Sequence, residues 1–153
     1  MSKTQSVINM LVRAVKKGFE FDYVLFDSWF FSKEILARIE SFITKGIKLI
    51  AMVKMGKTLY RDCLSGKEMD ATTLRKRYLD KAKRNRKYNA RYVKVSVWYD
   101  NRRVNLFFVK LGSGSKWSAF ITNDLEIGFS KLMEIYHIRW SCEVFFKDGK
   151  QHL

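Results

Sequence analysis

Four polar residues near the carboxyl end have the types and the spacing of a site that could bind a phosphate ester and act on it chemically. Tyr136, Arg139, Glu143 and Lys150 stand at offsets 0, 3, 7 and 14 within YHIRWSCEVFFKDGK. At about 100° per residue in a helix, the four fall within a stripe about 60° wide. The simpler interpretation is an ion pair between Arg139 and Glu143, four residues apart on an exposed helix face.

The apolar residues of the same segment predict where this stripe lies. They occupy the adjoining arc of the helix and are Ile135, Ile138, Cys142, Phe145 and Phe146. We therefore expect the polar stripe at the edge of the core, where a carboxylate is partly enclosed and flanked by cations.

A second carboxylate strengthens the chemical interpretation. Asp27 ends FDYVLFD, an apolar run typical of a strand buried on both faces of a parallel sheet. Open α/β sheets present their chemistry at the carboxyl ends of such strands. If Asp27 and Glu143 converge, each raises the pKa of the other, and a hard cation such as Mg²⁺ with oxygen ligands relieves that conflict. Two such ions would clamp the attacking and leaving oxygens of a phosphodiester.

Hydrophobic periodicity predicts the elements that must position these residues. In chain order it gives a helix over 4–17, a strand over 21–27, a helix from the cap Ser32 to Gly46 and a strand over 47–55. Residues 92–100 and 103–111 form the clearest hairpin, 115–124 add a strand, and a last helix begins near 123–128 and turns Phe129, Leu132, Ile135 and Ile138 inward. The strand–helix–strand order predicts a right-handed crossover of parallel strands.

Composition narrows the class of protein. The 153 residues are 47% hydrophobic, which is ample for a packed core, and carry a formal net charge of +15. That excess favours a polyanionic partner, nucleic acid before a membrane surface. No apolar run approaches the roughly 20 residues of a membrane span, so we expect a cytoplasmic chain with no membrane association. Cys63 and Cys142 lack the spacing of a zinc site or a disulfide framework.

The segment from Arg75 to Lys94 is the most basic part of the chain. It holds ten Lys and Arg residues against one acid, Asp80. Such a run is often only a solvated face, but interleaved tyrosines favour nucleic-acid binding. We take Arg84, Arg86 and Lys87 as candidate DNA contacts.

The Tyr136, Arg139, Glu143 and Lys150 spacing resembles the Y-R-E-K signature of DDE-type insertion-sequence transposases. Asp27-Ser28-Trp29-Phe30 is similar to the second-aspartate block of that family, and FITNDL leads into the last helix as it does there. The resemblance covers nearly the whole chain. It implies one α/β domain with an RNase H-like core formed by 1–55 and 117–153, and a β-rich basic insertion over 56–116.

The resemblance also implies roles. Asp27 and Glu143 would be the second and third acids of the triad and would bind Mg²⁺ or Mn²⁺. The remaining signature residues Tyr136, Arg139 and Lys150 would hold transposon-end phosphates, and Trp117 either stacks on an unpaired base or is a core residue. The reaction would be hydrolytic nicking followed by attack of the freed 3′-hydroxyl on a phosphodiester.

The chain departs from the family pattern at the first aspartate. No acid upstream of Asp27 lies on a suitable strand, so we expect an N-terminally truncated core that is inactive alone. The strand that ends at Asp27 should then present an apolar, unpaired edge. The expected partners are double-stranded DNA (transposon ends and target) and, at that edge, a second copy of the chain or the missing N-terminal part.

Two other functions stay open at this point. One is a non-catalytic basic module that binds DNA through 75–94, for which Glu143 and metal would be irrelevant. The other is an RNase H-like nuclease of different purpose, which would have no need of the Tyr, Arg and Lys spacing.

Overall fold

The computed structural model describes residues 3–18, 22–28, 31–41 and 46–142, with the side chains of 3, 4, 15 and 137–142 outside that description. Its elements are α1 (Lys3–Lys16), β1 (Tyr23–Phe26), α2 (Lys33–Glu40), β2 (Lys48–Val53), β3 (Leu59–Asp62), β4 (Glu68–Asp70), α3 (Ala71–Tyr78), a 3₁₀ turn η2 (Leu79–Lys81), β5 (Lys83–Asn85), β6 (Ala90–Tyr99), β7 (Arg102–Leu111), β8 (Trp117–Thr122) and α4 (Phe129–Cys142).

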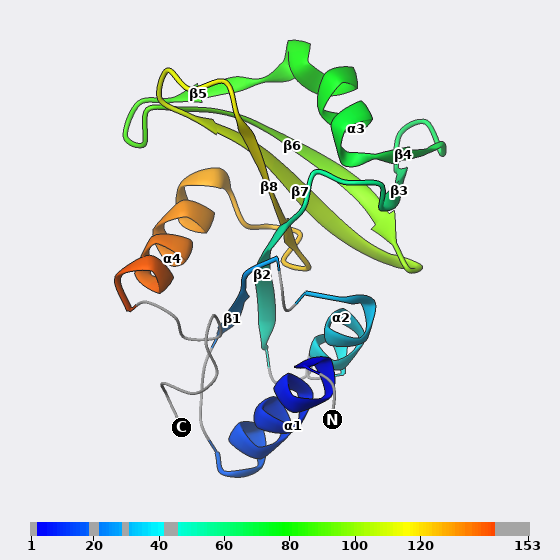
Figure 1. Cartoon of the computed structure of the whole chain (residues 1–153), viewed down its shortest axis with the longest axis vertical. Helices are drawn as coiled ribbons and strands as arrows, with labels where there is room; N and C mark the ends of the chain where they lie inside the picture. The colour runs from blue at the N-terminus through cyan, green and yellow to red at the C-terminus, as the bar shows by residue number, and fades with distance from the viewer. Residues whose placement is uncertain (1–2, 19–21, 29–30, 42–45, 143–153) are drawn as a thin grey trace.

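One mixed sheet runs through the described part of the chain (Figure 1). Its strand order is β1-β2-β8-β7-β6-β3-β4, with β5 paired to β6. β1 and β2 are parallel, as the strand–helix–strand pattern predicts, and the other pairs are antiparallel. The long β6–β7 hairpin continues the sheet beyond β1, β2 and β8. Residues 56–116 therefore extend the sheet that begins with β1.

The sheet has two covered faces. One packs on α1, α2 and α3, and we call it the α3 face; its core includes Leu11, Phe26, Ile35, Leu74, Val95, Phe108 and Ile121. The other packs on α4 and is the α4 face; its core includes Ile50, Phe107, Phe120, Phe129 and Leu132. Because helices cover both faces of the sheet, both faces of β1 and β2 are apolar, and their sequences are continuous apolar runs.

Local signals explain where several elements begin. Ser32 caps α2 as predicted, because its Oγ accepts a hydrogen bond from the Ile35 N–H at 3.3 Å. The β6–β7 turn uses Asp100 and Asn101 at positive φ, the conformation of a two-residue hairpin. α2 ends at Glu40, with Ser41 as its C-cap and the Ser41 Oγ donating to the Arg38 carbonyl. Residues 42–45, over which the helix was predicted to continue to Gly46, lie outside the described residues.

β1 lies at one end of the strand order. Among the described residues it pairs with β2 and with no other strand, and the predicted open edge stays a prediction. The elements β3, β4, α3 and β5 were not predicted. None of the described helices has both the length and the apolar character needed to cross a membrane.

Candidate active site

The carboxyl end of β1 carries the first candidate acid. Asp27 follows Phe26 directly and is half-buried, whereas Phe26 is fully buried on the α3 face. Burial alternates along β1, with Tyr23 and Leu25 packed on the α4 face. The strand therefore delivers Asp27 to the sheet end where parallel strands terminate, as predicted.

Helix α4 lies against this strand end. Its buried residues Phe129, Leu132, Met133 and Tyr136 recur at helical spacing and pack on the α4 face. The Tyr136 ring meets Phe120 edge to face, with ring centroids 4.9 Å apart. The Tyr136 hydroxyl donates a hydrogen bond to the Phe26 carbonyl oxygen at 3.3 Å, across 110 residues of sequence.

The buried position of Tyr136 corrects one expectation. The helical stripe predicted Tyr136 at the edge of the core, but only 2% of its surface is exposed. The apolar ring packs beside Phe120, and the hydroxyl donates its hydrogen bond to the main-chain carbonyl of Phe26. Its predicted DNA contact stays a prediction. The Arg139 side chain, Glu143 and Lys150 lie outside the described residues, so their predicted roles stay predictions too.

The segment between β8 and α4 fixes where α4 begins. Thr122 Oγ1 donates to the Leu49 carbonyl at 2.7 Å, and Asn123 Oδ1 accepts from the Leu49 N–H at 2.9 Å. The β2–β8 ladder ends with the pair Ile50 and Thr122, and these two side chains continue the hydrogen bonding beyond it. The sequence FITNDL suggests only a resemblance to the family. In the structure its polar residues Thr122 and Asn123 hold the chain that precedes α4 against β2.

Asp124 completes this anchor. Its carboxylate accepts hydrogen bonds from the Tyr23 hydroxyl and the Glu126 N–H, and the Lys48 ammonium lies 3.5 Å away. Burial opposes ionisation of Asp124, but the bonds from Tyr23 and Glu126 together with Lys48 outweigh it and lower its pKa. Burial and the same carboxylate raise the pKa of Tyr23. Sequence reasoning missed this group, because pairing across 101 residues leaves no local signal.

Trp117 is half-buried at the start of β8 and packs against the α3-face core. The Arg75 guanidinium carbon lies 5.1 Å from its ring centroid, and Lys110 Nζ lies 5.8 Å away. The ring is therefore in contact with two cations. The base-stacking role of Trp117 and the alternative core role both stay predictions.

The predicted DNA contacts of the basic segment are accessible. Arg84 lies on β5, while Arg86 and Lys87 lie in the turn to β6, and all three side chains are exposed. The Lys87 ammonium rests 5.4 Å from the Tyr88 ring centroid. A solvated surface and a nucleic-acid surface both fit this exposure.

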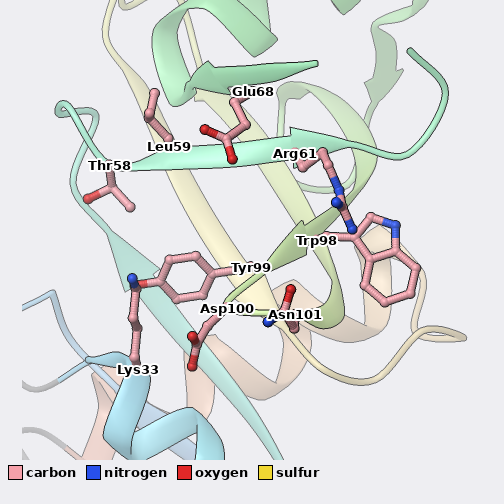
Figure 2. Close-up of a pocket in the computed structure, with 9 residues that line it drawn as sticks. All are labelled: Lys33, Thr58, Leu59, Arg61, Glu68, Trp98, Tyr99, Asp100 and Asn101. Carbon is pink, nitrogen blue, oxygen red and sulfur yellow. The ribbon is translucent and has the colours of Figure 1, made fainter. Parts of the chain in front are cut away.

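An open cleft of about 540 Å³ lies elsewhere, between α2, β3 and the tip of the β6–β7 hairpin. Figure 2 shows Lys33 reaching toward Tyr99, with Arg61 beside Trp98. Glu68 and Asp100 also line it, so its charge is mixed. None of the described residues predicted to act in chemistry lines this cleft.

We call the carboxyl end of β1 at Asp27, with the predicted ligand Glu143, the acid site. The ligand types of this site fit a hard cation. Asp27 offers carboxylate oxygens, the ligand type that Mg²⁺ and Mn²⁺ prefer. Within the described ranges no group of three or more His, Cys, Asp or Glu residues could hold a metal. Glu143, the other predicted ligand, follows the last described residue.

Comparison with known proteins identifies a family that matches this chain. The family model described as the transposase DDE domain covers residues 3–153. A search of curated proteins found no match.

Proposed function

The chain belongs to the transposase DDE domain family, and from that premise we propose that Asp27 and Glu143 are two acids of its metal-binding triad. The family is one of transposases, so its substrate is DNA, and DDE transposases generally use divalent metals. The mixed α/β fold around a central sheet is consistent with the RNase H-like fold of these domains.

The observation that carries the proposal is the contact between Tyr136 and Phe26. It joins α4 to the residue that immediately precedes Asp27. Glu143 follows Tyr136 by seven residues, about two helical turns and roughly 10 Å along the axis if the helix continues. Residues seven apart in a helix share a face, and this spacing is the reason for assigning Glu143 to the same site as Asp27.

A divalent cation would be held by the oxygens of Asp27 and Glu143. Bound there, it would supply positive charge to a phosphodiester at the strand end. The protein's own contribution is to fix the two carboxylates on a strand and a helix that Tyr136 links, and to bring cations to the phosphate. We assign that second task to Arg139 and Lys150, whose charge suits a phosphate diester.

The proposed reaction is hydrolytic nicking of DNA followed by 3′-hydroxyl strand transfer. Within one domain, 1–55 and 117–153 would form the RNase H-like core and 56–116 the insertion. Only two of the three acids have candidates among these 153 residues. We therefore propose that these residues by themselves bind Mg²⁺ or Mn²⁺ weakly and do not cleave DNA.

DNA affinity with and without Mn²⁺ tests the proposal. Duplex binding by the wild type should tighten when Mn²⁺ replaces EDTA, and Asp27→Ala or Glu143→Ala should remove that gain. Affinity in EDTA should stay unchanged or rise in these variants, because a negative charge near the phosphates is removed. Asp80→Ala, an exposed acid on η2, is the matched control and should keep the gain. Metal-dependent strand cleavage by the wild type, abolished in Asp27→Ala, would refute the proposed inactivity.

The second candidate function is a non-catalytic DNA-binding module. The net charge of +15 and the exposed Arg84, Arg86 and Lys87 favour it. Under this function Mn²⁺ has no effect on affinity, and Glu143→Gln leaves DNA binding unchanged or strengthens it by removing a negative charge.

A further inference from the structure

Four neighbouring strands place three cations and a tryptophan in one line across the sheet. Arg84 of β5 pairs with Arg91 of β6, and Arg91 pairs with Lys110 of β7. Lys110 in turn pairs with Trp117 of β8. Directly paired residues of adjacent strands point to the same face, with Cβ atoms about 5 Å apart. We call Arg84, Arg91, Lys110 and Trp117 the basic row.

Helix α3 adds a further cation to this line. Trp117 belongs to the α3-face core, and Arg75 of α3 places its guanidinium over the Trp117 ring. Lys110 approaches the same ring from the neighbouring strand. Cation–π attraction therefore holds Arg75 and Lys110 beside Trp117.

Acids do not neutralise the basic row within the described part of the chain. The ion pairs found there are Lys48–Asp124, Arg77–Asp62 and Arg102–Asp100. Arg75 Nε is buried and has no hydrogen-bond partner among the described residues. Because like charges directly opposite each other destabilise a sheet, the row is unfavourable until an anion lies over it. Arg84 and Arg91 are exposed, so an anion can reach them.

We propose that the basic row and Arg75 bind the phosphate backbone of a DNA segment, with Trp117 as the positioning residue for two of the cations. This inference rests on the proposed function, which makes DNA the substrate. Three strand spacings of about 4.8 Å give the row a length of about 14 Å. At about 3.4 Å per nucleotide of one strand, that length spans roughly four nucleotides.

The row is a separate surface from the acid site but lies toward the same end of the sheet. Phe26, Ala51 and Ile121 are in register, and Trp117 lies four residues further toward the carboxyl ends of β1 and β2. Tyr136 and α4 occupy the α4 face, whereas Trp117 packs on the α3 face. DNA on the row would therefore pass from beside the Asp27 end across β8, β7, β6 and β5.

The salt dependence of DNA affinity tests this proposal. The variant Arg84→Gln/Arg91→Gln/Lys110→Gln is compared with Arg38→Gln/Lys57→Gln/Lys67→Gln, three exposed cations outside the row. Both variants lose the same three charges. Affinity for a duplex is measured in EDTA over a range of salt concentrations, so that the acid site takes no part. Each lost phosphate contact should lower the slope of log K against log[salt] by about 0.9.

We expect the row variant to lose about two to three units of slope and the control variant less than one. The row variant should also unfold at the same or a higher temperature than the wild type, because repulsion between paired cations is relieved. Arg91→Gln alone should lower the slope by about 0.9 with little effect on folding. Trp117→Ala should weaken binding, and Trp117→Phe should restore it, since an aromatic ring still holds the cations.

Equal slopes for the row and control variants would overturn the inference while leaving DNA as the substrate. A wild type with no salt-dependent affinity for DNA would instead overturn the proposed function as well. Loss of binding to anionic vesicles in the row variant, with DNA affinity intact, would assign the row to a lipid surface and also refute the proposal.

Discussion

The Tyr136 hydroxyl donates to the Phe26 carbonyl oxygen at 3.3 Å and thereby joins α4 to the strand end that precedes Asp27. The partners are a helix from the carboxyl-terminal part of the chain and a strand from its amino-terminal part. Both residues are buried, at 2% and 0% exposed. Any site that uses Asp27 together with a residue of the last helix depends on this contact.

Removing the Tyr136 hydroxyl tests how much the contact contributes. Tyr136→Phe keeps the ring against Phe120 and should lower the free energy of unfolding by about 1 kcal/mol, the usual net contribution of a hydrogen bond. Denaturant unfolding measures the loss. Tyr92→Phe is the control, because the Tyr92 ring stacks on Phe129 and its hydroxyl has no hydrogen bond to the described residues. A loss of equal size in both variants would contradict a specific role for the Tyr136 hydroxyl.

Acid should destabilise the protein in part through Asp124. Its pKa is lowered in the folded state, below the usual value of 3.8. The ionised carboxylate therefore stabilises the fold above about pH 4, and that contribution is lost as the pH falls through the lowered pKa. We expect Asp124→Asn to show a flatter pH dependence of unfolding free energy between about pH 5 and pH 2 than the wild type. Tyr23→Phe, which removes one of the bonds, should be intermediate, whereas identical slopes would exclude this role for Asp124.

A buried carboxylate also stabilises the packing of α3 on the sheet. Asp62 on β3 is 1% exposed and accepts bonds from the Tyr78 hydroxyl at 2.7 Å and from Ser65 Oγ at 2.9 Å. Asp62→Ala leaves these donors without their partner and should lower the free energy of unfolding by about 3 kcal/mol. Asp80→Ala, on the surface, should change it by less than about 0.5 kcal/mol. Chemical denaturation measures the free energy of unfolding of both variants. Equal values would refute the role of Asp62 in stability.

The elements with strong periodicity could be predicted from the sequence. A helix was predicted over 4–17 and α1 covers Lys3–Lys16, while the predicted hairpin corresponds to β6 and β7. Long runs of alternating or helical apolar residues leave little choice of structure.

Short elements inside the basic segment escaped prediction. α3 has eight residues and buries only Ala71, Leu74 and Tyr78, so its apolar face is hidden among arginines and lysines. One signal was present: Asp70 precedes the helix and caps it through the Thr73 N–H at 2.8 Å. β3 and β4, of four and three residues, are too short for periodicity to reveal.

The candidate site was predicted unevenly for a related reason. Asp27 at a strand end follows from the local pattern of β1. The burial of Tyr136 does not, because a helical projection treats tyrosine as polar, whereas Phe120 and Phe26 make its environment apolar. The alignment of Arg91 with Lys110 depends on the register of the β6–β7 hairpin, which the two-residue turn at Asp100 and Asn101 sets. The sequence predicted the hairpin but placed Asp100 in its first strand, so this pairing was not predicted.

The central claim is that Asp27 and Glu143 hold a common divalent ion. Mn²⁺ affinity, measured by titration calorimetry for the wild type, Asp27→Ala, Glu143→Ala and the double variant, tests it most directly. We expect each single change to raise Kd at least tenfold, about 1.4 kcal/mol, and the double variant to be little worse, because both carboxylates serve one ion. Asp80→Ala should bind Mn²⁺ as the wild type does. Unchanged affinity in either single variant, or fully additive losses in the double variant, would contradict a shared site.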